Sequence, residues 1–286
     1  MLQRRVNFIH VPIALSLLFL SLAPLAPAAT APATGKQTEF YRPQASVKPK
    51  TQSASAIAVV NAASYLPGIS PGGLITIFGQ NLSNVNGIVY AGTDPLPTQL
   101  AGVTVVINGY YAPIYGVAYA NGEDQISVQV PYEVPVGPGV AQVQVYNNGV
   151  LVASVQEDSF TEDPGIFMYN STYAVAVHED YTLIGPSTPA FRGEVITLYT
   201  TGLGPLSLNL VDGYGAPSNP LAYTQDPFSV LVNGESCQVL FSGLAPGFVG
   251  LYQLNIVLPS DLPRGNLDIQ IVSPYASSGV ATLPVN

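Results

Sequence analysis

One segment of this chain occurs twice, with the same spacing of apolar residues in both copies. The stretch SPGGLITIFGQNL at residues 70–82 is matched by FRGEVITLYTTGL at residues 191–203. Two more matched pairs follow, VTVVING with FSVLVNG and QISVQVPYEVPVG with QLNIVLPSDLPRG, and the offsets drift from 121 to 125 and 128 residues. Such drift is what small loop insertions produce between two copies of one folding unit. The chain is therefore predicted to contain two tandem domains.

Each matched segment alternates between apolar and other residues, as a half-buried β-strand does. Asn-Gly pairs, which favour tight turns because Asn and Gly tolerate positive φ, separate several of these segments. The 26 prolines and 27 glycines argue against amphipathic helices. Several short strands in about 110 residues are typical of a β-sandwich. We therefore predict an all-β protein with two β-sandwiches in series.

The N-terminal residues differ from the rest in composition. A basic start, an apolar run at residues 11–23 and small residues after it predict a secretory signal peptide at residues 1–33. Retention of the apolar run as a membrane anchor stays open. Residues 34–56 are rich in Pro, Ala and Thr and predict a flexible tether. The two sandwiches are expected at residues 57–160 and 161–286.

The charge of the predicted domains is strongly acidic. From residue 57 onward only Arg192 and Arg264 are basic, against sixteen acidic residues, which gives a net charge of −14. Nucleic acids and anionic membranes bind clustered Lys and Arg, so both are poor partners for this surface. Cys237 is the one cysteine of the chain, so no intrachain disulfide forms, and we expect Cys237 to be a small buried residue.

The stretch SPGGLITIFGQNLS resembles the opening strand of IPT/TIG-type immunoglobulin-like domains. The span from VVNAASYLPGISPGG to FSGLAPGFVGLYQLNIVLPSDLPRG is similar to an uncharacterised C-terminal domain family of secreted acidobacterial proteins, the Solibacter type. The resemblance implies two extracellular immunoglobulin-like domains and no established activity. The second repeat departs from the pattern, since it has Thr200 and Gly202 where the first has Gly79 and Asn81.

No catalytic constellation is evident in the sequence. A Ser-His-Asp triad would need His178, the one histidine after the predicted signal peptide, but VAVHEDYTL reads as a strand ending in a hairpin. The acidic residues stand mostly in turns beside Pro or Gly, where solvated carboxylates are expected. We therefore expect no enzymatic activity.

Two clusters of side chains are candidate binding sites, one for a metal ion and one for a sugar or a protein. The stretch QEDSFTED brings four carboxylates together at the predicted domain junction, and carboxylates are the oxygen ligands that Ca²⁺ prefers. The junction residues are Glu157, Asp158, Glu162 and Asp163; the alternative is a solvated acidic linker. The stretch YYAPIYGVAY is dense in tyrosine, which can stack on sugars or anchor a protein contact, although tyrosine is also an ordinary strand residue. Its four tyrosines are Tyr110, Tyr111, Tyr115 and Tyr119.

Together these observations predict a secreted or cell-surface, non-enzymatic immunoglobulin-like module for adhesion, spacing or protein–protein contact. The alternative is a carbohydrate-binding accessory module that uses the tyrosine-rich face. An extracellular protein or a polysaccharide is the expected partner. No cofactor is expected, apart from the calcium considered at the junction.

Overall fold

The computed structural model describes residues 56–286. The predicted signal peptide and nearly all of the predicted tether lie outside these residues. Within them the structure has twenty β-strands and no helix, and hence none that could cross a membrane. The chain is all-β, which confirms the predicted fold class.

The first repeat folds into two sheets that share one core. Its strands are β1 (Ile57–Asn61), β2 (Leu74–Gly79), β3 (Gly87–Tyr90), β4 (Gln99–Leu100), β5 (Val103–Ile107), β6 (Tyr110–Tyr111), β7 (Ile114–Ala120), β8 (Glu123–Gln129), β9 (Gly139–Asn147) and β10 (Val150–Ser159). One sheet has the order β1-β2-β8-β7-β3, and the other has β10-β9-β5-β4 with β6 beside β5. Apart from the short flanking strands, these are the A-B-E-D and G-F-C orders of an immunoglobulin-like sandwich.

The core of this sandwich comes from the alternation seen in the sequence. Val103, Val105 and Ile107 on β5 are fully buried, and Ile75 and Ile77 on β2 face them from the other sheet within the same cluster. The residues between them on β5 are only partly buried. Because side chains alternate across a strand, the period of two places one set inside and one set outside.

The second repeat has the same strand order. Its strands are β11 (Gly165–Ile166), β12 (Met168–Tyr169), β13 (Tyr173–Ala174), β14 (Ala176–Val177), β15 (Val195–Thr201), β16 (Ser229–Val232), β17 (Glu235–Leu244), β18 (Tyr252–Val257), β19 (Gly265–Val272) and β20 (Ala281–Val285). They form the order β11-β15-β18-β17-β16-β19-β20-β13-β12, with β14 beside β15. The matched sequence segments occupy equivalent positions: β2 and β15, β5 and β16, β8 and β18, β9 and β19.

One strand differs between the two sandwiches. In the second, β17 pairs with β16 through its first residues and with β18 through the rest, with a bulge between Val239 and Phe241, so it passes from one sheet to the other. In the first, the corresponding segment is interrupted at Ala112 and Pro113 and becomes β6 and β7. Proline has no N–H for a sheet hydrogen bond, so a break at this point is expected.

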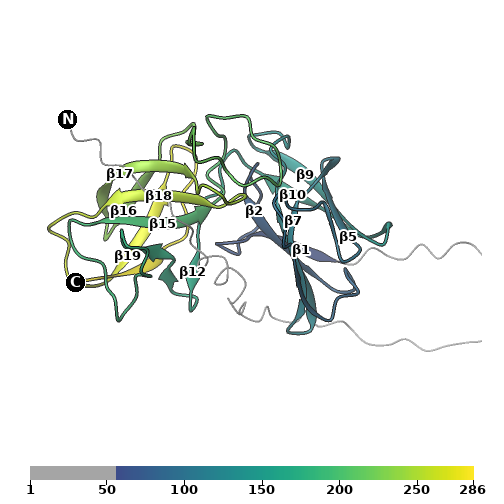
Figure 1. Ribbon diagram of the computed structural model, residues 1–286, viewed down its shortest axis with the longest axis horizontal. Coiled ribbons are helices and arrows are strands. Elements are labelled where there is room, and N and C mark those ends of the chain that lie inside the picture. The colour runs from purple at the N-terminus through teal and green to yellow at the C-terminus, as the bar shows by residue number, and fades with distance from the viewer. Residues whose placement is uncertain (1–55) are drawn as a thin grey trace, which may run out of the picture.

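The two sandwiches lie side by side and share a buried interface (Figure 1). An apolar cluster joins Leu74, Leu96 and Tyr115 of the first to residues of the second. Its members from the second sandwich are Phe167, Val175, Val177, Tyr199, Ala245, Val249 and Leu251. The Leu74 N–H donates to Thr201 Oγ1 at 2.8 Å, and the Thr201 hydroxyl donates to the Gly250 carbonyl at 2.9 Å. Buried apolar area and direct hydrogen bonds together fix how the sandwiches are docked.

Candidate protein-binding edge

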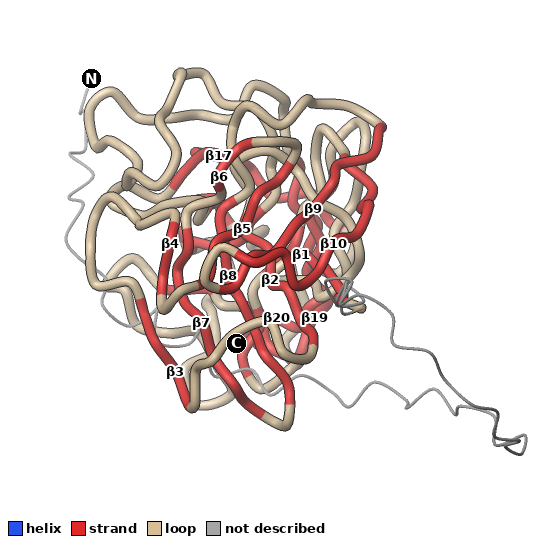
Figure 2. The backbone as a smooth tube through the Cα atoms, turned by 90° about the vertical axis from the view of Figure 1, so that its right-hand side faces the viewer, coloured by secondary structure: helices blue, strands red, loops and turns tan. Residues whose placement is uncertain are grey.

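The short strand β3 forms one edge of the first sandwich and is the least covered strand of that sheet. It pairs with β7 on one side, and no described strand pairs with its other side (Figure 2). Its sequence, GIVY, has three apolar side chains in a row, and Ile88, Val89 and Tyr90 are 52%, 36% and 50% exposed. Consecutive strand residues point to opposite faces, so Ile88 and Val89 are exposed on opposite faces of β3, and among residues 56–286 no strand lies at its outer edge.

The backbone of β3 presents hydrogen-bonding groups along that open side. The Ala91 N–H donates to the Tyr115 carbonyl at 2.9 Å, continuing a ladder in which Val89 lies opposite Val117 on β7. In an antiparallel pair every second residue bonds to the partner strand, and the residues between turn their N–H and C=O outward. The Ile88 backbone therefore points away from β7, toward the place where a further strand would add.

The second sandwich shows how such a position can be filled. There, residues 222–224 lie beside the end of β17: the Thr224 N–H donates to the Ser242 carbonyl and the Leu244 N–H to the Ala222 carbonyl, each at 3.0 Å. Tyr223 between them turns outward, and its carbonyl accepts the Ser207 N–H at 2.7 Å. Residues 222–224 thus take the place of β3 in the second sandwich, and the loop residue Ser207 covers their outer side, which no described segment covers in β3.

The other edges of the first sandwich are shorter, more buried or charged. β4 has two residues, and β1 has its last three residues buried. β10 carries Glu157 and Asp158 and has a bulge between Leu151 and Ala153, and both charge and bulges discourage edge-to-edge pairing. By contrast, residues 57–93, which contain β3, include no charged side chain. β3 was not among the sites predicted from the sequence; its signal is an uninterrupted apolar run, without alternation, between two turn segments.

The four tyrosines of the predicted face do not form one surface. Tyr110 and Tyr111 are 43% and 62% exposed on β6, whereas Tyr119 is exposed at the far end of β7, opposite Gly87 of β3. The expectation of an exposed ring is wrong for Tyr115, which is buried in the interface with the second sandwich. Its hydroxyl donates to the Val249 carbonyl at 2.6 Å and accepts the Val249 N–H at 3.1 Å. Burial raises the pKa of Tyr115 well above its usual value.

The four acidic residues at the junction do not form one metal site, although the Asp158 and Asp163 carboxylates lie close enough to Glu157 to add to the rise in its pKa that burial causes. Glu157 and Asp158 are neighbours on β10 and so point to opposite faces. The Glu162 carboxylate accepts from the Ser273 hydroxyl, and the Asp163 carboxylate accepts from the Asn61 amide at 3.1 Å. Among residues 56–286 no group of three or more His, Cys, Asp or Glu could hold a metal ion. Calcium binding at the junction stays a prediction without a preformed site.

A loop of the second sandwich adds polar contacts to the interface. The Asp212 carboxylate accepts the Tyr132 N–H at 2.9 Å, and the Gln129 side-chain oxygen accepts the Gly213 N–H at 2.8 Å. Burial raises the pKa of Asp212 to about 7; the nearby Glu133 carboxylate raises it as well, while the Tyr132 N–H acts in the opposite direction. This carboxyl group is therefore a pH-sensitive contact between the two sandwiches.

The remaining side chains with reactive groups, His178 and Cys237, are held in a hydrogen-bonded turn and in a buried strand. His178 lies in a tight turn, where its N–H donates to the Thr182 carbonyl at 3.0 Å, and its ring Nδ1 lies 3.1 Å from the Glu194 carboxylate. Cys237 is buried on β17, and burial raises its thiol pKa to about 11.

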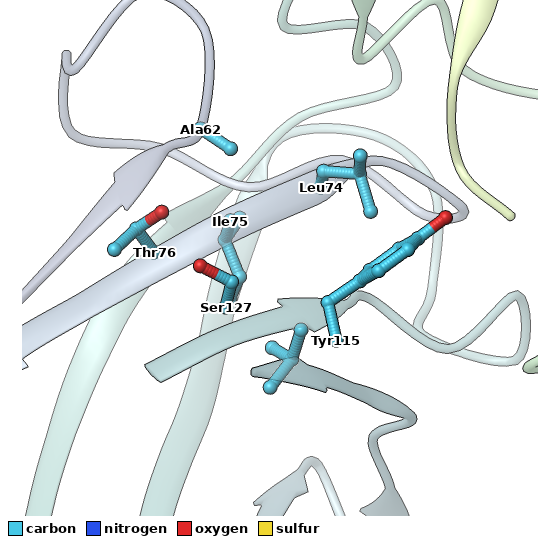
Figure 3. A pocket seen from close by; sticks show the side chains of 7 residues that line it. Ala62, Leu74, Ile75, Thr76, Tyr115 and Ser127 are labelled. Atoms are coloured by element: carbon cyan, nitrogen blue, oxygen red, sulfur yellow. The ribbon is translucent and has the colours of Figure 1, made fainter. Parts of the chain in front are cut away.

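A cavity of about 10 Å³ between Leu74, Thr76, Tyr115 and Ser127 has room for about one water molecule. Figure 3 shows the Tyr115 ring beside Leu74, with its hydroxyl directed away from Thr76 and Ser127.

No protein-family model and no curated protein matches the sequence. Similar solved structures include the Bacteroides ovatus mixed-linkage glucan utilization locus protein SGBP-B in complex with a heptasaccharide (11% identity, TM-score 0.33), the I9–I11 tandem of titin (12%, 0.21) and the Yersinia pseudotuberculosis adhesin InvE (10%, 0.21). The matches cover 76%, 81% and 80% of this chain and 42%, 65% and 58% of those chains. The chain thus spans less than two thirds of each, and at these TM-scores the resemblance is no evidence for a shared ligand or partner.

Proposed function

We propose that this chain is an exported, non-enzymatic immunoglobulin-like module for protein–protein contact, and that a partner binds by adding a strand to β3. The observation that carries the proposal is the outer edge of β3, which no strand of residues 56–286 covers, together with the consecutive exposed side chains of Ile88 and Val89. Main-chain hydrogen bonds along such an edge supply affinity, and the side chains of alternate residues supply specificity.

The docking of the two sandwiches supports this role. The buried cluster and hydrogen bonds between them hold β3 in a fixed orientation relative to the second sandwich. A rigid tandem presents its binding edge without the entropy cost of ordering a hinge. Adhesion and spacing both need a partner to be held at a set distance, and two rigidly docked sandwiches can do this.

Site-specific photocrosslinking tests the proposal. A photoreactive benzoylphenylalanine replaces Val89 on β3, and in a control it replaces Leu240, which is 51% exposed on β17. After irradiation of the producing cells, we expect a protein adduct from position 89 and none from position 240. Mass spectrometry then identifies the adduct. Equal labelling from both positions, or none from position 89, would contradict protein contact through β3.

The carbohydrate-binding alternative has weaker support. Tyr110 and Tyr111 are adjacent on β6 and point to opposite faces, so they do not make a flat stacking platform together. Among the four tyrosines of the predicted face, Tyr111, at 62% exposed, is the best single candidate for stacking on a sugar. Saturable binding to one member of a polysaccharide panel, lost in Tyr111→Ala and kept in Val89→Lys, would favour this alternative over the protein contact.

A further inference from the structure

We propose that the strand that adds to β3 is β3 of a second copy of this chain, related by a two-fold axis near Ile88. This inference rests on the proposed function of the β3 edge and names its partner. The two first sandwiches would then share one continuous sheet.

The geometry of an antiparallel edge suits pairing with itself. In a two-fold interface the same surface patch faces its own copy, so residue i contacts residue j and residue j contacts residue i. Ile88 has outward-facing N–H and C=O groups, because the ladder to β7 runs through Val89 and Ala91. Placed opposite its own copy, each Ile88 donates one hydrogen bond and accepts one.

The second sandwich supplies an internal precedent for what fits here. The outward-facing Tyr223 is bonded by Ser207, a loop residue of the same sandwich: the Ser207 N–H donates to the Tyr223 carbonyl at 2.7 Å, and the Tyr223 N–H donates to Ser207 Oγ at 3.0 Å. Within residues 56–286 no equivalent segment covers Ile88. The missing partner is therefore a donor and an acceptor for the outward Ile88 groups, and Ile88 of another copy supplies both.

Charge favours β3 as the place where two copies meet. Residues 57–286 carry a net charge of −14, so two copies repel each other over most of their surface. Residues 57–93, which include β3, contain no charged side chain, so these residues add no charge repulsion when two copies pair through β3. Because salt screens the remaining repulsion over about 10 Å at 0.1 M, we expect the dimer to strengthen as ionic strength rises.

The size of the contact sets its strength. A four-residue edge buries less than the roughly 1,200–2,000 Å² of a standard stable interface, so we expect weak, reversible association. At low concentration the protein is then a monomer, and pairing grows as copies are concentrated, for example when many of them are held on one surface.

Sedimentation velocity on the chain from residue 34 onward tests the inference, over a wide concentration range at low and high salt. We expect a concentration-dependent monomer–dimer equilibrium that shifts toward dimer with salt. Val89→Lys should weaken dimerisation at least about tenfold, because the two lysines then lie diagonally across the axis on one face of the shared sheet, each opposite Gly87 of the other copy, and edge charges oppose pairing. Leu240→Lys, which adds the same charge at an exposed site outside β3, is the matched control.

A second variant addresses the backbone directly. Ile88→Pro removes the outward N–H while leaving the ladder to β7 intact, so it should also weaken dimerisation with an unchanged thermal melt. Monomers at every concentration and salt, or dimers that persist equally in Val89→Lys and Ile88→Pro, overturn the second-copy inference. If position 89 still crosslinks a different protein, the proposed function stands; if it crosslinks nothing, that function fails too.

Discussion

At the scale of single residues, Asn81 and Gly202 show how one backbone position is used twice. They occupy equivalent places in the two repeats, and both have positive φ, +59° and +79°. Asn tolerates this left-handed region better than most residues, so Asn81 fits where its side chain is exposed. At Gly202 a Cβ would run into the carbonyl of Asp163 in the segment that joins the sandwiches. The difference between the copies therefore reflects packing at the junction.

We expect Gly202→Ala to destabilise the protein by about 2–4 kcal/mol, through backbone strain and a steric clash together. The matched control is Gly234→Ala, which has nearly the same φ of +81° but open space around the added Cβ. It should cost only the strain, about 1 kcal/mol. Urea unfolding of both variants measures the difference, and equal losses would show that the contact with Asp163 does not matter.

Asp212 gives the stability of the protein a pH dependence. Its pKa is raised from 3.8 to about 7 by burial and by Glu133, so the folded state holds this proton more tightly than the unfolded state. The resulting stabilisation is fully present below about pH 4 and is lost as pH rises through about 7. Asp212→Asn removes this titration, and its amide oxygen can still accept the Tyr132 N–H.

The comparison of wild type with Asp212→Asn by thermal melting isolates this group, because other carboxyl groups with raised pKa, such as Glu162 and Asp163, remain in both proteins. We expect the wild type to lose stability relative to the variant between pH 4 and 7, and the difference to stay constant above about pH 8. A difference that does not change with pH would contradict the raised pKa.

At the scale of elements, the sequence was most informative where large apolar residues alternate along a strand. Alternation located β2, β5, β8 and β9 and their partners in the second repeat, because each has one face in a core. It could not locate β3, whose apolar residues are exposed on both faces, so no period of two marks it. Tyr115 was misassigned for a related reason: its outward face is buried by the other sandwich, which the periodicity of one strand cannot reveal.

The alternating direction of the β3 backbone is directly measurable. In dilute protein the Val89 amide, which bonds to β7, should be protected from hydrogen exchange, whereas the outward Ile88 amide should exchange much faster. NMR-detected exchange resolves the two neighbours. At high concentration the Ile88 amide should become slower if copies pair through this edge, while equal and fast exchange at both residues would mean that β3 does not form a ladder with β7.

At the scale of the whole molecule, the interface between the sandwiches is the feature that the sequence did not predict. Part of its contacts come from loops, residues 205–227 and 245–251, which have no periodicity and whose partners lie about 80 to 134 residues away. The duplicated sequence predicts two units, since each has its own core, but it says nothing about how they dock. The apolar cluster around Leu74 and Tyr115 answers that question.

Because the interface is buried and hydrogen-bonded, we expect the two sandwiches to unfold together. Calorimetry of the chain from residue 34 onward should show one transition, with equal calorimetric and van't Hoff enthalpies. Tyr115→Ala leaves a cavity and removes both hydrogen bonds to Val249, which should lower the free energy of unfolding by about 3–5 kcal/mol. The variant weakens mainly the contact between the sandwiches, so the single transition should broaden or split into two. Tyr111→Ala, on the exposed strand β6, is the control and should leave one transition. Two separate transitions already in the wild type would mean that each sandwich is stable alone and that the interface contributes little to holding β3 in place.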